Sequence, residues 1–106
     1  MLGELQLNTD KNVEGHERAE AYFSAELETA LARFEDKITR IEVHVGDENS
    51  AKPGINDKRC LIEVRPAKLQ PIVVTDHADT VEKAFKGALD KIKKSLVTTF
   101  EKQKEH

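Results

Sequence analysis

Four short stretches of the chain alternate apolar and polar residues, and this period of two predicts half-buried β-strands. They are residues 4–9, 40–45, 58–65 and 72–75. Each strand would bury one face and leave the other for solvent, because successive side chains point to opposite sides of a sheet. The predicted inward residues of the second and third strands are Ile41, Val43, Val45, Cys60, Ile62 and Val64.

Two longer stretches carry apolar residues at steps of three and four, which indicates amphipathic α-helices. The first extends from about His16 to Lys37 and the second from Val81 to Phe100. Asp79, followed by Glu82 three residues later, predicts a capping box at the start of the second helix. The apolar stripes comprise Phe23, Leu27, Ala30, Leu31, Phe34 and Ile38 in the first helix, and Val81, Phe85, Ala88, Leu89, Ile92, Leu96 and Phe100 in the second.

The order of these elements predicts an α+β fold with the topology β-α-β-β-β-α. The last three strands should form an antiparallel meander, and both helices should cover one face of a four-stranded sheet, because each has one apolar stripe to bury. The opposite face would then be open to water or to a partner. Residues 46–57, rich in Gly, Asp and Asn, should form a long loop, and residues 101–106 a solvated tail. Residues 1–106 are expected to form a single domain.

Charge is distributed unevenly along the chain. The formal net charge is −3, whereas nucleic-acid binders are usually basic. Residues 1–79 hold 10 basic and 16 acidic residues, a net charge of −6, while residues 80–106 hold 7 lysines and 4 acids, a net charge of +3. The first predicted helix is acidic on its polar face, so the second helix is the element with a sustained positive excess.

The residue pattern does not favour catalysis, a metal site or a membrane protein. Cys60 is the single cysteine and stands in an apolar run, where a small core residue is expected. The four histidines have no partner at zinc-ligand spacing, and no Gly-rich phosphate loop is present. We therefore expect no enzyme activity, catalytic residue, metal, cofactor or small-molecule substrate. The longest apolar runs have three residues, far fewer than a membrane span needs. The chain also does not begin with a signal-peptide pattern. A cytoplasmic protein is therefore expected.

Lysines of the second helix are the strongest candidates for a binding site. At about 100° per residue, several of them fall on one flank of that helix, and such a stripe can follow a phosphate backbone. An ordinary solvated helix face has the same spacing. Few aromatic residues remain outside the apolar stripes, which favours recognition of backbone and shape over base reading. The candidates from spacing are Lys83, Lys86, Lys93, Lys94 and Lys104, with Lys58, Arg59 and Arg65 as a second patch on the third strand.

Three phrases of the sequence resemble one known family. They are LQLNTDKN at residues 5–12, ARFEDKITRIEVHV at residues 32–45 and AFKGALDKI at residues 84–92. Together with the order and length of the elements, they resemble the ribosome hibernation promoting factor and ribosome-associated inhibitor family, also called the sigma-54 modulation family, in its short form. The resemblance covers about residues 3–100.

The resemblance implies a fold related to double-stranded-RNA-binding domains. It also implies a monomer that contacts 16S rRNA on the small ribosomal subunit, in the channel used by messenger and transfer RNA, and silences idle ribosomes under stress. Two features differ from the family pattern: Ser95–Phe100 is uncharged where members carry an Arg/Lys run, and the first helix is acidic. The basic residues of the family's second helix correspond here to Lys83, Lys86, Lys91, Lys93 and Lys94.

Three functional hypotheses follow from these observations. The first is a ribosome-associated factor that binds the small subunit through rRNA and modulates translation. The second is a divergent member of the family that lacks ribosome binding and serves as a protein-interaction module, with a basic partner meeting the acidic helix. The third, a small enzyme, has almost no support in the sequence.

Overall fold

The computed structural model describes residues 4–9, 16–47 and 58–104. Its elements are, in order, β1 (Glu4–Thr9), α1 (His16–Leu31), the 3₁₀ helix η1 (Ala32–Lys37), β2 (Ile38–Asp47), β3 (Lys58–Pro66), β4 (Ile72–Ala78) and α2 (Val81–Lys104). The predicted order of strands and helices is confirmed. The predicted loop at 46–57 begins two residues too early, because β2 includes Gly46 and Asp47, and the rest of that loop lies outside the described residues.

The four strands form one mixed sheet in the order β1-β2-β3-β4. β1 runs parallel to β2 and places Leu5 beside Ile41, while β2, β3 and β4 form the predicted antiparallel meander. In this register Ile41, Val64 and Ile72 lie next to one another across three strands. The inward faces of the strands therefore join into one continuous apolar surface.

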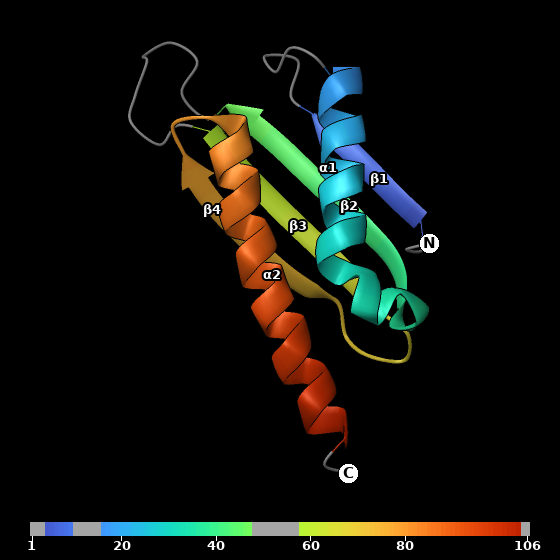
Figure 1. The fold of residues 1–106 in the computed structure, drawn as a ribbon. Coiled ribbons are helices and arrows are strands. Elements are labelled where there is room, and N and C mark those ends of the chain that lie inside the picture. Colours follow the sequence, from blue (N-terminus) through green and yellow to red (C-terminus); the bar gives the residue numbers. More distant parts are fainter. Residues whose placement is uncertain (1–3, 10–15, 48–57, 105–106) are drawn as a thin grey trace.

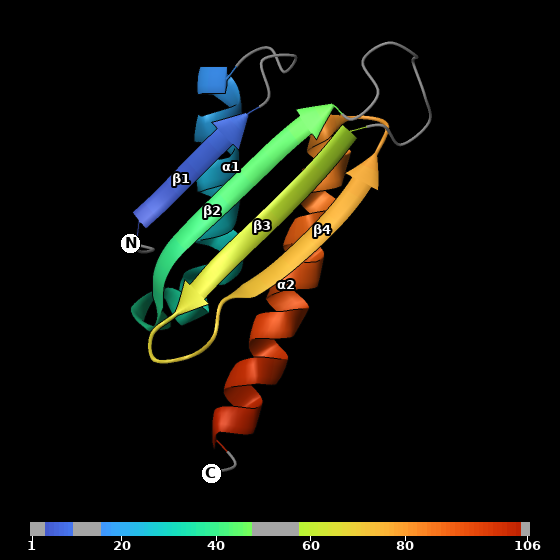
Figure 2. The ribbon, with the colours of Figure 1, turned by 180° about the vertical axis from the view of Figure 1, so that it is seen from behind.

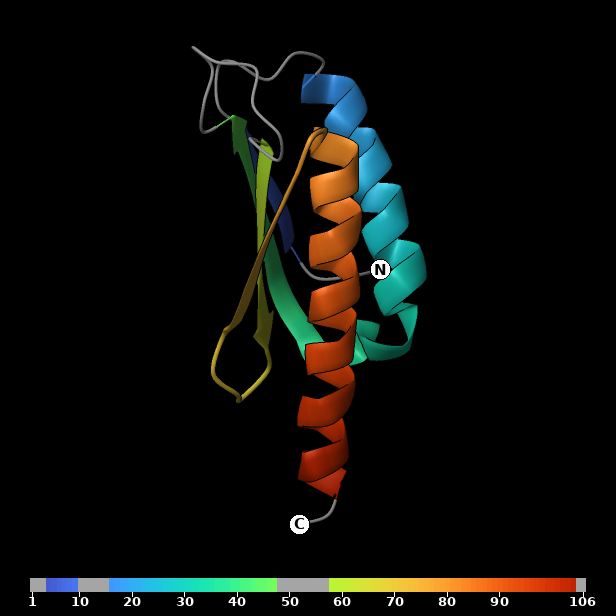
Figure 3. The same cartoon turned by 90° about the vertical axis from the view of Figure 1, so that its left-hand side faces the viewer.

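Both helices lie on the same face of the sheet and run side by side across it (Figure 1). Seen from behind, the opposite face is covered by none of the elements that the structure describes (Figure 2). A side view shows the two layers, and the C-terminal turns of α2 extend past the end of the sheet (Figure 3). The arrangement confirms the predicted fold class and gives α2 a long outer surface.

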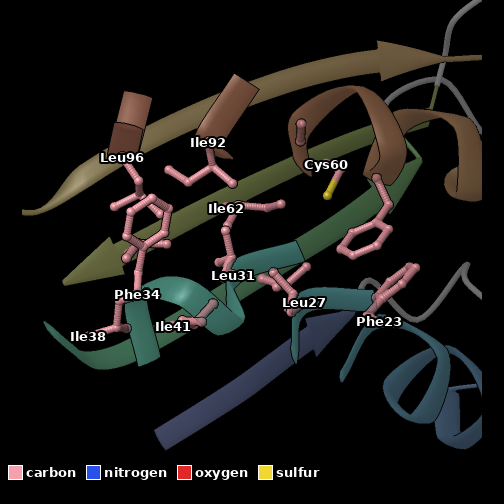
Figure 4. Close-up of a cluster of buried hydrophobic side chains, with 14 of the residues drawn as sticks. Phe23, Leu27, Leu31, Phe34, Ile38, Ile41, Cys60, Ile62, Ile92 and Leu96 are labelled. Carbon is pink, nitrogen blue, oxygen red and sulfur yellow. The ribbon is translucent and has the colours of Figure 1, made fainter. Parts of the chain in front are cut away.

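The hydrophobic core fills the space between the two layers (Figure 4). Phe23 of α1 stacks on Phe85 of α2 with ring centroids 4.0 Å apart, and Phe34 of η1 packs on Phe100 of α2 at 5.1 Å. Complete burial of a side chain such as Phe85 stabilises the fold by about 1.5–3 kcal/mol. The two aromatic pairs hold α2 against α1 near its start and against η1 near its end. Of the residues in the two predicted apolar stripes, three are only partly buried: Ala30, Val81 and Leu89.

The first helix is shorter than the apolar spacing predicts. α1 ends at Leu31, and the next six residues tighten into η1. Because a 3₁₀ helix has three residues per turn, Phe34 follows Leu31 onto the buried side. The backbone N–H of Ala67 donates to the carbonyl oxygen of Lys37 at 2.8 Å, which ties the end of η1 to the end of β3.

The start and the end of α2 also differ from the prediction. Thr80, not Asp79, is the N-cap: its Oγ1 accepts from the N–H of Lys83 at 3.1 Å, and its carbonyl accepts from the N–H of Ala84 at 3.0 Å. Asp79 instead forms an ion pair with Lys83. The helix continues to Lys104, so most of the predicted tail is helical.

Candidate nucleic-acid interface

α2 places five of the predicted binding residues on one element. Their exposure follows from the apolar stripe of the same helix, since Phe85, Ala88, Ile92 and Leu96 are buried against the sheet and α1. The side chain of Lys104, also predicted from spacing, lies outside the described part. The five exposed lysines are Lys83, Lys86, Lys91, Lys93 and Lys94.

Three of these lysines are paired with acids of the same chain. Lys83 lies 3.2 Å from Asp79, and Lys94 lies 3.0 Å from Asp90; both pairs span four residues. Exposed pairs of this kind contribute about 0.3–0.5 kcal/mol, so solvent and phosphate can compete for these lysines.

Lys91 makes the most extensive of these contacts. Its Nζ donates to the carbonyl oxygen of Thr75 at 2.9 Å and to the Asp76 carboxylate at 3.2 Å. Both acceptors belong to β4, so Lys91 holds α2 against the edge of the sheet.

Lys86 and Lys93 differ from Lys83, Lys91 and Lys94. Both are exposed, and neither forms an ion pair with any residue that the structure describes. At about 100° per residue they fall roughly 40° and 20° from Phe100 around the helix, whereas Lys91 falls about 180° away. Because Phe100 contacts η1, the flank with Lys86 and Lys93 is the one turned toward α1 and η1.

The second predicted patch on β3 is divided between the two faces of the sheet. Arg59 and Arg65 alternate with buried residues, so they lie on the uncovered face, which Figure 2 shows. Lys58 shares its side with Cys60 and therefore points toward the helix layer. The structure thus keeps Arg59 and Arg65 apart from the α2 lysines, with the sheet between them.

The uncovered face carries a charge cluster that the sequence patterns did not single out. Glu42 and Glu63 stand opposite each other on neighbouring strands, and each has an arginine two residues away along its own strand. Arg40 lies 3.6 Å from Glu42 and Arg65 lies 3.0 Å from Glu63. The hydrogen bond from Arg65 lowers the pKa of Glu63. Arg40 also donates to the amide oxygen of Gln6. In the sequence, the position of Arg40 directly before the inward-facing Ile41 was the signal that its side chain lies on the uncovered face.

Comparison with protein-family models gives one match, over residues 8–104, to the family described as sigma 54 modulation protein / S30EA ribosomal protein. The chain belongs to this family. Its members are ribosome-associated factors, and the resemblance seen in the three sequence phrases is therefore confirmed. Comparison with the sequences of curated proteins finds no match.

Two solved structures share the fold of this family member. One is the N-terminal domain of Protein Y from Thermus thermophilus, with a TM-score of 0.67 and 17% identity over 90% of this chain and 94% of that chain. The other is a ribosomal subunit interface protein from Coxiella burnetii, with a TM-score of 0.65 and 17% identity over 91% of this chain and 96% of that chain. At this identity the likeness concerns the fold.

The uncharged segment Ser95–Phe100 of this family member has a structural basis. Leu96 and Phe100 are buried, and Val97 packs at the edge of the core. Phe100 closes the core against Phe34 at the point where α2 passes the end of the sheet. This part of α2 therefore contributes packing, and its positive charge is concentrated earlier, at residues 83–94.

The thiol of Cys60 is buried in the core. Burial raises the pKa of the Cys60 thiol to about 12, and the nearby Asp76 carboxylate adds to the rise, so this thiol stays protonated and unreactive near neutral pH. Within the described ranges no group of three or more His, Cys, Asp or Glu side chains could hold a metal ion. Among the same residues, no helix is long and apolar enough to cross a membrane.

Proposed function

We propose that the protein binds the small ribosomal subunit through the phosphates of 16S rRNA and thereby modulates or silences translation. The observation that carries this proposal is the flank of α2 with the exposed Lys86 and Lys93, which form no ion pair with the described residues, in a chain of a ribosome-associated family. A monomer in the cytoplasm, where ribosomes are located, belongs to the same proposal. So does the absence of catalysis, since binding alone is sufficient to block a ribosomal channel.

Contacts by the remaining lysines of α2 would be weaker. Lys83, Lys91 and Lys94 must each leave or share a carboxylate before they can bind a phosphate. Because exposed pairs are worth little, this lowers their contribution without removing it. Arg59 and Arg65 lie on the other face of the sheet, so a single RNA strand that follows α2 does not reach them.

The acidic helix α1 supports a defined orientation on the ribosome. Glu20 and Glu28 are exposed, and their carboxylates would be repelled by phosphate. We infer that the outer side of α1 faces away from RNA, or toward a basic protein of the ribosome.

Co-sedimentation with purified 30S and 70S particles tests the proposal. The triple variant Lys86→Glu, Lys93→Glu, Lys94→Glu should lose most of its 30S association, because it replaces three cations with three anions on one helix. Circular dichroism should show an intact fold, since all three side chains are exposed.

Charge reversal on α1 is the matched control. Glu20→Lys with Glu28→Lys should leave 30S binding unchanged or strengthen it. A wild-type protein that never associates with 30S or 70S particles would favour the protein-interaction hypothesis, with α1 as the contact. A triple variant that binds as well as wild type would move the contact to Arg59 and Arg65 on the uncovered face of the sheet.

A further inference from the structure

Lys37 lies far from α2 in sequence but reaches its surface in the fold. Its Nζ lies 5.0 Å from the ring centroid of Phe100, within the range of a cation–π contact. In a 3₁₀ helix residues three apart are eclipsed, so Lys37 shares its side of η1 with the buried Phe34. Glu35 and Asp36 project from the other two sides. The exposed Lys37 ammonium is therefore directed toward α2, away from the acids of its own element.

The position of Lys37 continues the line of Lys86 and Lys93. Lys93 is seven residues after Lys86, and Phe100 is seven residues after Lys93. Seven residues are nearly two helical turns, so each step advances about 10 Å along α2 and turns it by only about 20°. The third position of this spacing on α2 is Phe100, which carries no charge. The Lys37 ammonium lies over the Phe100 ring and supplies the cation at that position.

These three lysines also share an electrostatic property. None of Lys37, Lys86 and Lys93 forms an ion pair with a residue in the described ranges, in contrast to Lys83, Lys91 and Lys94. A phosphate that approaches them replaces water and no carboxylate. Lys37 is also held in place, because its backbone carbonyl accepts from Ala67 and its side chain rests on Phe100.

We propose that Lys37, Lys86 and Lys93 form a three-cation line that contacts successive phosphates of one RNA backbone along the α1-facing flank of α2. The RNA is ribosomal if the proposed function holds, on which this inference rests. Lys37 replaces, from another element, the positive charge that the segment Ser95–Phe100 lacks.

Carboxylates border this line on both helices, since Glu82 and Asp90 of α2 each fall about 40° from Lys86 and α1 adds Glu26. Tyr22 of α1 contacts Phe85 of α2, and Glu26 follows Tyr22 by one helical turn, so the partly buried Glu26 faces the same flank. Glu28 is exposed and about 200° away around α1. Glu26→Gln should therefore strengthen RNA binding, while Glu28→Gln, with the same change in charge, should have little effect.

A matched pair of variants tests the line on 30S subunits. Lys37→Met keeps the apolar stem over Phe100 and removes the charge, and Lys83→Met makes the same charge change on the outer side of α2. Loss of one phosphate contact reduces the magnitude of the slope of log K against log salt by about 0.7–0.9. At 0.1 M salt this corresponds to a loss of affinity of roughly sixfold. We expect this loss for Lys37→Met, recovery in Lys37→Arg, and less than a twofold effect for Lys83→Met. The proposed three-cation line would be contradicted if Lys37→Met and Lys83→Met lowered the 30S affinity equally. An unchanged salt slope in Lys37→Met would contradict it as well.

An NMR titration of the wild-type protein with a short RNA duplex separates this inference from the proposed function. Amide shifts centred on Lys37, Lys86 and Lys93 would support the line even if 30S subunits are not bound, in which case the ribosomal function alone fails. Shifts centred on Lys83 and Lys94, shifts on the uncovered face of the sheet, or no shifts at low salt would reject the line itself.

Discussion

At the scale of single residues, Gly87 sets the distance between α2 and β4. A Cβ at this position would overlap the carboxylate of Asp76, which is the group that binds Lys91. The glycine thus gives space to a carboxylate that joins helix and sheet. A glycine inside a helix is compatible with a close approach of a neighbouring element, but the partner residue is 11 positions away and is defined only by the packing of α2 on β4.

A double-mutant cycle tests this role of Gly87. Gly87→Ala should destabilise the wild-type protein, because overpacking costs about 1–3 kcal/mol and outweighs the gain of up to about 1 kcal/mol in helix propensity. In an Asp76→Ala background the same substitution should be stabilising, since the carboxylate no longer occupies the space. Urea unfolding measures both effects, and equal values in the two backgrounds would show that Gly87 and Asp76 are not coupled.

At the scale of elements, the N-terminus of α2 determines where the lysines begin. Thr80 provides the cap through its side-chain oxygen and its carbonyl, while Asp79 is one residue too early and contacts Lys83 from outside the helix. Asp and Thr are both favoured N-caps, so the sequence alone did not decide between neighbouring positions. The hydrogen-bond pattern of the first turn decides it.

Alanine substitutions at these two positions should have unequal effects. Thr80→Ala should lower the free energy of unfolding by about 1 kcal/mol, because the N–H of Lys83 loses its acceptor. Asp79→Ala should cost less than half as much, since it removes only an exposed ion pair. Thermal or urea unfolding gives both values, and a larger loss for Asp79→Ala would contradict the assignment of the cap.

At the scale of the whole molecule, periodicity and element order predicted the elements, the antiparallel meander and the face that the helices cover, but not the pairing of β1. Phe23, Ile62 and Ile92 are in the core as their spacing indicates, because burial of one face is a local property of a strand or helix. The parallel pairing of β1 with β2 depends on how the elements assemble. The separation of Lys58 from Arg59 and Arg65, in contrast, follows from the alternation of side chains along β3 alone.

In the candidate interface, too, the sequence showed what lies on a single element but not the contacts between elements. The lysines of α2 were visible in the sequence because they share one helix. Lys37 was not, since its approach to Phe100 requires the 3₁₀ turn of η1 and the packing of Phe34 on Phe100. Pairing with acids across elements, as between Lys91 and Asp76, likewise appears only in the folded chain.

The affinity of the wild-type protein for purified 30S subunits over a series of salt concentrations tests the central claim most directly. If the three-lysine line contacts three phosphates, log K should fall linearly with log salt with a slope of about −2 to −3. Absence of association at low salt, or an affinity that does not change with salt, would contradict binding through the rRNA backbone.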